Sequence, residues 1–321
     1  MENSHTENSA PRRGIYCLAN DGVLEWFIAF IKSLRQHNPT LPLRVIPFDE
    51  DCAQLRELCS RYDFSIIEAP LQDYDAIGER FVPGQAGAHT FRKFYAFAGE
   101  FDEFLFLDSD IVVVDDLTPL FAAFARSDAD VLFTDRDVEH VYAAGELYER
   151  SLHDPRYKAF NTGIWMARRG LLQLEQLGEL ARAAHASGQM HHDYDQPFIN
   201  FCLHETGARL REAREELPHI FERAWAADPD ITKCDNIAAR FNPEVTPNGK
   251  WMPFLHWAGY GTPPIIPNGK IFLHYRLAGE SSLQRALYHG RNNVVFHHIR
   301  TGYKRNAGRV QRVLKRLSKR N

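Results

Sequence analysis

Blocks of apolar and polar positions alternate along the first two thirds of the chain. Short apolar runs rich in β-branched and aromatic residues predict strands, and longer stretches with one apolar face predict helices. The predicted strands are residues 14–18, 43–48, 64–68, 104–107, 111–114, 131–134 and 160–167. The predicted helices are residues 24–37, 51–61, 90–99, 117–127, 171–187 and 196–204. This alternation favours an α/β fold with a mainly parallel central sheet and flanking helices.

The later part of the chain contains an internal echo. The segments PNGKWMPFLHW at 247–257 and PNGKIFLHY at 267–275 each begin with an Asn-Gly pair, which is typical of a turn. Each segment is therefore predicted to form a turn and then a strand that ends in a histidine, His256 or His274. Residues 69–90 contain Gly and Pro and are predicted to form a loop with short helical pieces.

Domain organisation follows from these patterns. We expect one folded domain over residues 14–278, preceded by a disordered polar tail at 1–13 and followed by a helical segment at 279–321. The apolar fraction of 44% is ordinary for a globular chain of 321 residues. The five cysteines form no C-x-x-C pair, so we expect reduced thiols and a cytoplasmic protein.

Charge is distributed unevenly. Residues 300–321 carry nine Lys and Arg and no acidic residue, while the whole chain has a net charge of −4. The apolar positions of this tail predict one helical stripe, formed by Val310, Val313, Leu314 and Leu317. We expect this helix to lie on an anionic membrane surface; the alternative is a solvated helix packed on the acidic body. Nucleic acid is not expected, because Tyr303 is the one aromatic residue among these charges.

The candidate chemistry begins at Asp108-Ser109-Asp110, which lies between two apolar runs. A strand that ends in this motif places two carboxylates at the carboxyl edge of the sheet, where open α/β proteins bind ligands. Two hard oxygen ligands suit Mn²⁺ or Mg²⁺ completed by substrate phosphates. The alternative is a turn in which the Asp side chains bond their own backbone.

Three further elements follow in order: FNTG from Phe160, Asp195-Gln196, and His256-Trp257-Ala258-Gly259. Together with Asp108-Ser109-Asp110, their order and spacing resemble glycosyltransferase family 8 and its relatives with the GT-A fold, which is Rossmann-like. The resemblance runs from about Gly14 to about Arg276. It implies a hexosyltransferase that takes a UDP-sugar and retains the anomeric configuration, acting on an acceptor of unknown kind: a glycan, lipid-linked, small-molecule or protein acceptor.

The resemblance also implies a role for each residue. Asp108, Asp110 and His256 would hold the divalent ion, and Asn161 and Asp195 would bond the donor sugar, with Gln196 under the anomeric carbon. The rest of the donor site would comprise Ala19, Asn20 and Asp21 near the base, Arg92 or Lys93 near the ribose or diphosphate, and Ser109, Gly163 and Gly259. The family commonly has Lys-Pro after His-x-x-Gly, where this chain has Thr262-Pro263, so Lys250 or Arg276 would have to replace that lysine.

These residues also have structural interpretations. Asn161 and Gly163 would simply begin a strand, Asp195 would cap a helix, and His256 would be a core histidine, leaving His274 as a competing ligand. The cluster His191-His192-Asp193 resembles a metal site, but adjacent side chains point in different directions. We expect it to form a solvated loop or to contact the acceptor.

Two other functions compete with the transferase. A haloacid-dehalogenase-like phosphohydrolase shares the strand followed by Asp108-Ser109-Asp110, but in that class the motif normally lies on the first strand. A transferase-like protein that binds a UDP-sugar without efficient catalysis fits the missing lysine. A sugar-phosphate nucleotidyltransferase is disfavoured, because the loop Ala19-Asn20-Asp21-Gly22 lacks the Gly-rich, basic character that it needs.

Overall fold

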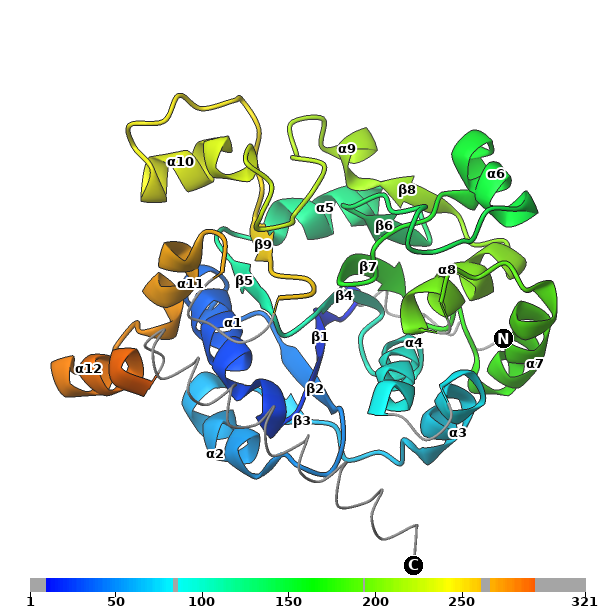
Figure 1. Ribbon diagram of the computed structural model, residues 1–321, viewed down its shortest axis with the longest axis horizontal. Helices are drawn as coiled ribbons and strands as arrows, with labels where there is room; N and C mark the ends of the chain where they lie inside the picture. Colours follow the sequence, from blue (N-terminus) through cyan, green and yellow to red (C-terminus); the bar gives the residue numbers. More distant parts are fainter. Residues whose placement is uncertain (1–9, 83–85, 193, 261–265, 292–321) are drawn as a thin grey trace, which may run out of the picture.

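A computed structural model describes residues 10–82, 86–192, 194–260 and 266–291 of the chain. Within them lies a seven-stranded sheet with the strand order β3-β2-β1-β4-β7-β6-β8 (Figure 1). Its strands are β1 Arg13–Ala19, β2 Leu43–Pro47, β3 Ser65–Ile66, β4 Glu103–Leu107, β6 Val131–Phe133, β7 Ile164–Arg168 and β8 Leu210–Glu212. Among these strands β7 alone runs antiparallel to its neighbours β4 and β6. The prediction of a mainly parallel sheet is confirmed.

The central strands are apolar on both faces because each face has its own core. In β1, Ile15 and Cys17 belong to one buried cluster, whereas Tyr16 and Leu18 belong to the other. Successive side chains of a strand point to opposite faces, so a strand between two helical layers must be apolar at nearly every position. This explains why the strands read as continuous apolar runs in the sequence.

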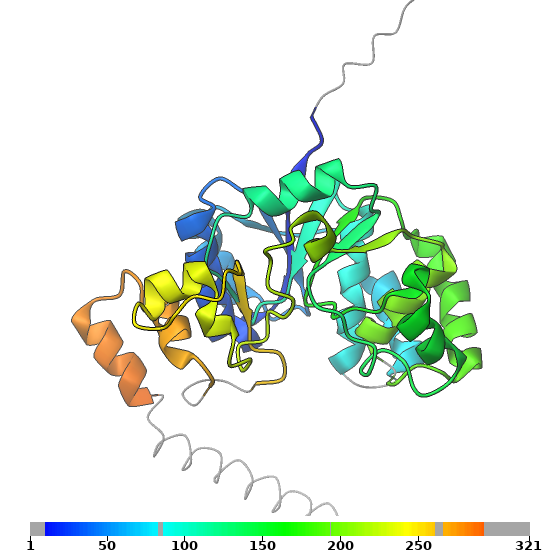
Figure 2. The same cartoon turned by 90° about the horizontal axis from the view of Figure 1, so that it is seen from above.

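Two layers of helices cover the sheet (Figure 2). The first face is covered by α1 Leu24–His37, α2 Ala53–Tyr62, α5 Thr118–Arg126, α10 Asp235–Phe241 and α11 Gly269–Arg276. The second face is covered by α3 Gln72–Phe81, the 3₁₀ segment η2 Ala86–Phe94, α4 Tyr95–Ala98, α6 Glu146–His153, α7 Leu174–Ser187 and α8 Asp195–Glu205. The remaining helices are η1 Asp21–Val23, η3 Pro155–Tyr157, α9 Ala213–Glu216, η4 Ile231–Lys233 and α12 Ser282–Arg291.

A second, two-stranded sheet lies beside the first. It joins β5 Ile111–Val113 to β9 Phe254–His256 in antiparallel register. The β5 strand follows β4 after a short turn, so the chain passes from the large sheet into the small one at Asp108-Ser109-Asp110. Strands β4 and β5 are both fully buried, which anchors the turn between them from both sides.

Residues 69–90 contain helical pieces, as predicted, but α3 fills more of this stretch than a loop with short pieces implies. Tyr74, Ile77 and Phe81 bury one face of α3 at helical spacing. Gly78, which weakens a helix prediction, permits close packing here: a Cβ at this position would lie 2.2 Å from the Ala88 carbonyl oxygen. The predicted helix at 90–99 is half 3₁₀ and half α-helical, since η2 extends to Phe94 and α4 follows it.

The internal echo was also misleading. Its first copy contains the strand β9, as predicted, but its second copy forms the helix α11. Ile271, Phe272 and Tyr275 are buried on one side of this helix, which packs against α1. His274 therefore contacts the Phe241 ring instead of the carboxylates at the β4–β5 turn.

The five cysteines are all free, as expected. Within the described residues, no helix is long and apolar enough to cross a membrane. Residues 1–9 of the expected disordered tail and residues 292–321 of the C-terminal segment lie outside the described residues. The proposed domain boundaries stay predictions.

A buried histidine makes the fold sensitive to acid. The Nδ1 atom of His204 lies 2.6 Å from the Tyr142 hydroxyl, and its Nε2 atom lies 3.0 Å from the Lys158 carbonyl oxygen. Because that carbonyl oxygen must accept, Nε2–H donates to it and Nδ1 accepts from Tyr142. Burial lowers the pKa of His204 to about 4. The neutral form is thus the one that the native state holds.

We expect this histidine to reduce stability as the pH falls. Its stabilising contribution is complete above its unfolded pKa of about 6.5 and is lost as the pH falls toward 4. The free energy of unfolding should drop by about 2 kcal/mol from this group between pH 7 and pH 5. Urea unfolding of the wild type and of His204→Gln at both pH values checks this, since the gap between the two proteins should shrink at pH 5. His153→Gln, whose side chain is 77% exposed, is the control and should change neither value.

Candidate active site

The two carboxylates of the acidic motif are held at the carboxyl end of β4 by backbone bonds. The Asp108 N–H donates to the Gly163 carbonyl oxygen at 2.9 Å. The Asp110 carbonyl oxygen accepts from the Trp257 N–H at 3.0 Å. Both side chains are half-buried, although a freely exposed edge was expected. The turn is therefore fixed by backbone bonds to Gly163 and Trp257, which flank strands β7 and β9.

His256 completes a three-residue cluster. It ends β9 and pairs with Ile111 of β5, which places its ring beside the turn. The Nε2 atom lies 3.2 Å from Asp110 Oδ1 and 4.0 Å from Asp108 Oδ2. One ligand atom from each of the three residues lies within 4.8 Å of the other two. The structure therefore brings together the three residues predicted from the sequence. The histidine of the cluster is His256 and not the alternative candidate His274.

The electrostatics of this cluster follow from burial and from the mutual approach of its charges. Burial lowers the pKa of His256, but Asp110 and Asp108 outweigh that effect and raise it above its ordinary value. Burial raises the pKa of Asp110, but the imidazole of His256 outweighs it, so that the net shift is downward. Burial and the nearby Asp110 raise the pKa of Asp108, against the opposite effect of Lys93. The imidazole thus stabilises Asp110 as a carboxylate.

Asn161 and Gly163 enter the site at the amino end of β7. The Gly163 N–H donates to the side-chain oxygen of Asn161 at 2.9 Å. A Cβ on Gly163 would lie 2.3 Å from Cε1 of His256 and 3.0 Å from Asp108 Oδ2. Glycine is needed here because the backbone passes directly over the side chains of His256 and Asp108. The FNTG element does more than begin a strand.

Lys93 links the cluster to a second carboxylate. Its Nζ atom lies 3.0 Å from Asp108 Oδ1 and 2.9 Å from Asp195 Oδ2, and its side chain is buried. Burial lowers the pKa of Lys93, but these two carboxylates more than offset that effect and raise it. The ammonium is therefore charged, and it leaves Oδ2 of Asp108 facing His256.

Gln196 is fixed at both ends of its amide. Its Oε1 accepts from the Thr162 N–H at 3.2 Å, and its Nε2 donates to Asp137 Oδ2 at 3.0 Å. Asp137 was not identified from the sequence, nor was Asp135, a half-buried carboxylate near His256. Burial raises the pKa of Asp135 to about 6. The segment TDRD after β6 has no distinctive motif, although two Asp residues just after a strand are a weak signal of a site.

The loop expected near the base lies at the carboxyl end of β1, the strand next to β4. The Asn20 side chain accepts from the Gly22 N–H and donates to Asp49 Oδ2 at 2.8 Å. The Asp21 carboxylate accepts from the N–H groups of Gln54 and Leu55, so it caps α2. The Ala19 carbonyl oxygen accepts from the Phe48 N–H. These bonds give the loop a structural role, in addition to any contact with a ligand.

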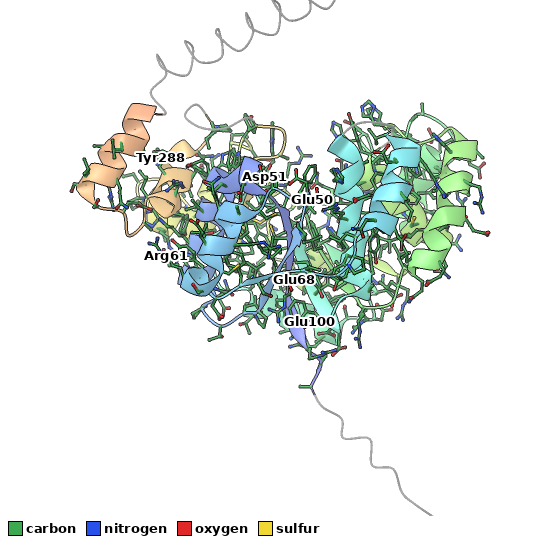
Figure 3. The ribbon with its side chains drawn as sticks, turned by 90° about the horizontal axis from the view of Figure 1, so that it is seen from below. Glu50, Asp51, Arg61, Glu68, Glu100 and Tyr288 are labelled. Atoms are coloured by element: carbon green, nitrogen blue, oxygen red, sulfur yellow. The ribbon has the colours of Figure 1, made fainter. Side chains whose placement is uncertain are left out.

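Glu50 and Asp51, which follow β2, lie on the opposite side of the molecule from Glu100, which precedes β4 (Figure 3). Arg92 lies close to the end of the sheet that bears Glu50 and Asp51. It makes two bonds of 2.7 Å to Asp75 and donates to the Pro47 carbonyl oxygen at 2.9 Å. Its guanidinium is thus already engaged, whereas Lys93, the next residue, points into the cluster.

The two candidate substitutes for the missing lysine are occupied elsewhere. Lys250 donates to the Pro218 carbonyl oxygen, and Arg276 pairs with Glu25 at 2.7 Å. Lys250 also lies six residues before His256, a separation of about 20 Å in extended chain. Thr262 lies outside the described residues. Lys93 is the cation that the structure places against the carboxylates of the motif.

The other predicted residues take peripheral positions. Ser109 is half-buried in the turn between the two ligating carboxylates, and Gly259 is exposed with a φ of +79° that favours glycine. His191 and His192 are exposed and pack ring against ring at 4.0 Å. Neither belongs to the one group of metal-ligating side chains found among the described residues, and Asp193 lies outside them.

The cluster Asp108–Asp110–His256 fits a divalent metal ion. Two carboxylates and one imidazole from short, well-anchored segments offer three ligands on one side and leave the other side for substrate oxygens. This mixed oxygen and nitrogen donor set suits Mn²⁺, and it accepts Mg²⁺ less well because Mg²⁺ prefers oxygen. The half-burial of the carboxylates keeps them accessible from the sheet edge.

Solved structures show which fold this is. A galactosyltransferase, LgtC, in complex with donor and acceptor sugar analogues matches 85% of this chain and 99% of its own, with a TM-score of 0.54 and 12% identity. An active-site mutant of LgtC matches 84% of this chain and 96% of its own, with a TM-score of 0.53 and 12% identity. The chain therefore has the GT-A glycosyltransferase fold.

A larger protein shares the same fold. The apo structure of a bifunctional glycosyltransferase, WbbM, matches 87% of this chain, with a TM-score of 0.51 and 14% identity. This chain spans about half of that protein, 51% of its length. No protein-family model matches the chain, and no curated protein matches its sequence.

Adding one methyl group at Gly163 should damage the cluster. The new Cβ would lie 2.3 Å from the buried His256 ring, which would have to move away from Asp110. We expect Gly163→Ala to lower the free energy of unfolding by about 1–3 kcal/mol and to weaken Mn²⁺ binding at least tenfold. Thermal unfolding and calorimetric titration with Mn²⁺ measure both effects.

Gly178→Ala is the matched control, because its Cβ would meet Arg80 at an ordinary 3.6 Å on helix α7. It should leave Mn²⁺ affinity unchanged. A Gly163→Ala protein with wild-type stability and Mn²⁺ affinity would show that the backbone does not pack against the cluster as described.

Proposed function

We propose that this protein is a divalent-metal-dependent glycosyltransferase that moves a hexose from a UDP-sugar to an acceptor with retention of anomeric configuration. The observation that carries the proposal is the cluster Asp108–Asp110–His256 at the carboxyl edge of the sheet, joined through Lys93 to Asp195. In this proposal a dication site lies next to a fixed lysine, and that lysine lies next to a carboxylate for the donor sugar. The GT-A fold is compatible with glycosyl transfer, and the residues of this site provide the groups that the reaction needs.

Each side chain has a defined task in this proposal. Asp108, Asp110 and His256 would hold the Mn²⁺, which when bound would supply positive charge against the departing nucleoside diphosphate. Asp195 accepts hydrogen bonds from hydroxyls of the donor sugar while Lys93 fixes its orientation. The Gln196 amide, held by Thr162 and Asp137, presents its dipole to the oxocarbenium-like anomeric centre.

On the donor side, Ala19, Asn20 and Asp21 form the base loop and Asn161 contacts the sugar. Asn161 is positioned for this by its bond to the Gly163 N–H at the edge of the cluster. Ser109, Gly163 and Gly259 let the chain approach the donor closely. Arg92, already paired with Asp75, contributes to the walls of the site more than to charge balance.

The competing functions meet specific obstacles in the structure. A haloacid-dehalogenase-like phosphohydrolase would carry its motif on the first strand, whereas β1, β2 and β3 all precede Asp108 here. A binding protein without catalysis would not need Gln196 held from two sides. Calorimetric titration with UDP, with and without Mn²⁺, followed by a hydrolysis assay over a panel of UDP-sugars, separates these functions.

We expect Asp110→Asn to abolish donor hydrolysis and to remove the Mn²⁺ dependence of UDP binding. The amide keeps the shape of the side chain but removes the charge that pairs with His256 at 3.2 Å and would bind the ion. Activity should fall at least a hundredfold, as measured by release of UDP. Asp63→Asn, at an exposed position with a φ of 50° that asparagine tolerates, is the control. Normal turnover by Asp110→Asn in EDTA would rule out the metal mechanism.

We also propose that the C-terminal segment attaches the protein to the inner face of a membrane. Helix α12 exposes Leu283 (70%) and Leu287 (53%) four residues apart, on one helical stripe. The helix is joined to the body by Tyr288, whose ring lies 4.9 Å from the Arg276 guanidinium (Figure 3). The nine cations of residues 300–321 follow in sequence, in a stretch outside the described residues. An apolar stripe followed by cations suits an anionic surface.

Deleting residues 304–321 tests this attachment. The full chain should sediment with vesicles that contain anionic phospholipid at low salt, and the truncated chain should not, because each well-placed cation contributes about 1 kcal/mol. Donor hydrolysis should be retained, since the deletion leaves the GT-A domain complete. Vesicles of neutral phospholipid are the control. Equal binding of both proteins, or loss of folding on truncation, would assign the tail a structural role instead.

A further inference from the structure

An exposed tryptophan lies beside the metal-ligand cluster. Trp225 forms a parallel β-bridge with His256, and the flanking backbone bonds (Ala226 N–H to the His256 carbonyl, His256 N–H to the Ala224 carbonyl) are both 2.8 Å. Residues paired in this way lie about 5 Å apart and point their side chains to the same face. The indole of Trp225 therefore lies on the side to which the His256 imidazole points.

Trp225 also belongs to a small aromatic surface. Its ring centroid lies 6.4 Å from that of Tyr260, with 32° between the planes, so the two rings are close to parallel. Trp225 is 38% exposed, and within residues 10–82, 86–192, 194–260 and 266–291 its indole N–H has no hydrogen-bond partner. A large aromatic side chain left open beside a polar site is typical of a surface that binds a ligand.

Polar groups flank this aromatic surface. Arg223 lies two residues before Trp225 and approaches Asp135, a carboxylate near His256. Its Nε atom lies 4.0 Å from Asp135 Oδ1, and its side chain remains 57% exposed. The loose pairing of Arg223 and Asp135 leaves hydrogen-bonding capacity on both groups, next to the open indole.

The position of these residues separates them from the nucleotide side of the site. The base loop follows β1, whereas Asp135 follows β6, and the strand order β1-β4-β7-β6 puts three strand spacings, about 14 Å, between them. The ligating residues Asp108 and His256 lie between the two ends. A nucleotide at the base loop would leave the Trp225 side to the second substrate.

We propose that Trp225, Tyr260 and Arg223 form the acceptor platform and that the acceptor presents a saccharide ring. The proposal rests on the transferase function above and adds its second substrate class. The C–H face of a pyranose packs on an indole, while its hydroxyls bond to a guanidinium, a carboxylate and the indole N–H. A lipid tail would require a continuous apolar patch, which Arg223 and Asp135 interrupt.

The transfer then balances without any further reactant. The acceptor hydroxyl oxygen forms a bond to the anomeric carbon, and the bond from that carbon to the diphosphate oxygen breaks. The hydroxyl proton leaves on the departing diphosphate. Trp225 and Arg223 act by placing the hydroxyl, and a loss of this placement should appear in acceptor affinity.

Binding of the full-length protein to an array of immobilised saccharides, in the presence of UDP and Mn²⁺, tests the platform. The wild type should bind a subset of the array, and Trp225→Ala should lower the affinity for that subset at least tenfold. Trp225→Phe keeps an aromatic ring and should stay within threefold of the wild type. Leu152→Ala, at an exposed apolar position on α6, is the control and should bind as the wild type does.

Calorimetric titration with UDP and Mn²⁺ separates the two levels of the proposal. UDP affinity should differ by less than twofold among all four proteins. If the wild type binds UDP but no saccharide, or if Trp225→Ala binds saccharides with unchanged affinity, the acceptor assignment is overturned while the donor site stands. If UDP fails to bind the wild type, the transferase proposal itself fails, and the acceptor assignment fails with it.

Discussion

The site depends on a positive charge that balances the negative charge of carboxylates at one edge of the sheet. Asp108, Asp110 and Asp195 come from two distant parts of the chain, and their mutual repulsion in a half-buried place opposes folding. Lys93 offsets it by pairing with Asp108 and Asp195 at about the same distance. A buried lysine without these partners would itself be costly, so cation and carboxylates require each other.

That mutual requirement connects the site to the aromatic core beneath it. Lys93 lies between Phe91 and Phe94 of η2, whose rings pack against Phe198 of α8 at 5.6 Å and 5.3 Å. Asp195 begins this same helix. The contact that joins η2 to α8 therefore also sets the distance between the ammonium and its second carboxylate. Apolar packing positions the charges, and the charges decide which face of η2 turns inward.

The reversed strand β7 explains how residues from opposite strand ends meet. Because β7 is antiparallel to β4, its amino end lies beside the carboxyl end of β4, and Gly163 adjoins Asp108. An all-parallel sheet would have placed Asn161 and Gly163 at the far edge. The absent side chain of Gly163 then gives His256 the space to approach both carboxylates. The strand direction thus brings Gly163 to the cluster, and its missing methyl group leaves room for the His256 ring.

The sequence was most informative where function and local pattern coincide. Helix 24–37 was predicted with its observed bounds, and Asp108, Asp110 and His256 meet as expected, because each lies beside a strand with a clear apolar pattern. The second copy of the echo failed since burial against α1, not its resemblance to the first copy, decides that it is helical. Local sequence does not contain that contact.

The same limit applies to the acceptor side of the site. The proposed donor side is built from strand ends and their turns, whose positions follow from apolar periodicity. Trp225 and Arg223, in contrast, lie on an irregular segment that is ordered by isolated bridges such as Trp225 to His256, and Asp135 is brought near Arg223 by tertiary packing. Such segments can vary in sequence without disturbing the sheet. The residues proposed to hold an ion and a diphosphate are therefore readable from pattern, whereas those proposed to choose an acceptor become visible through the fold.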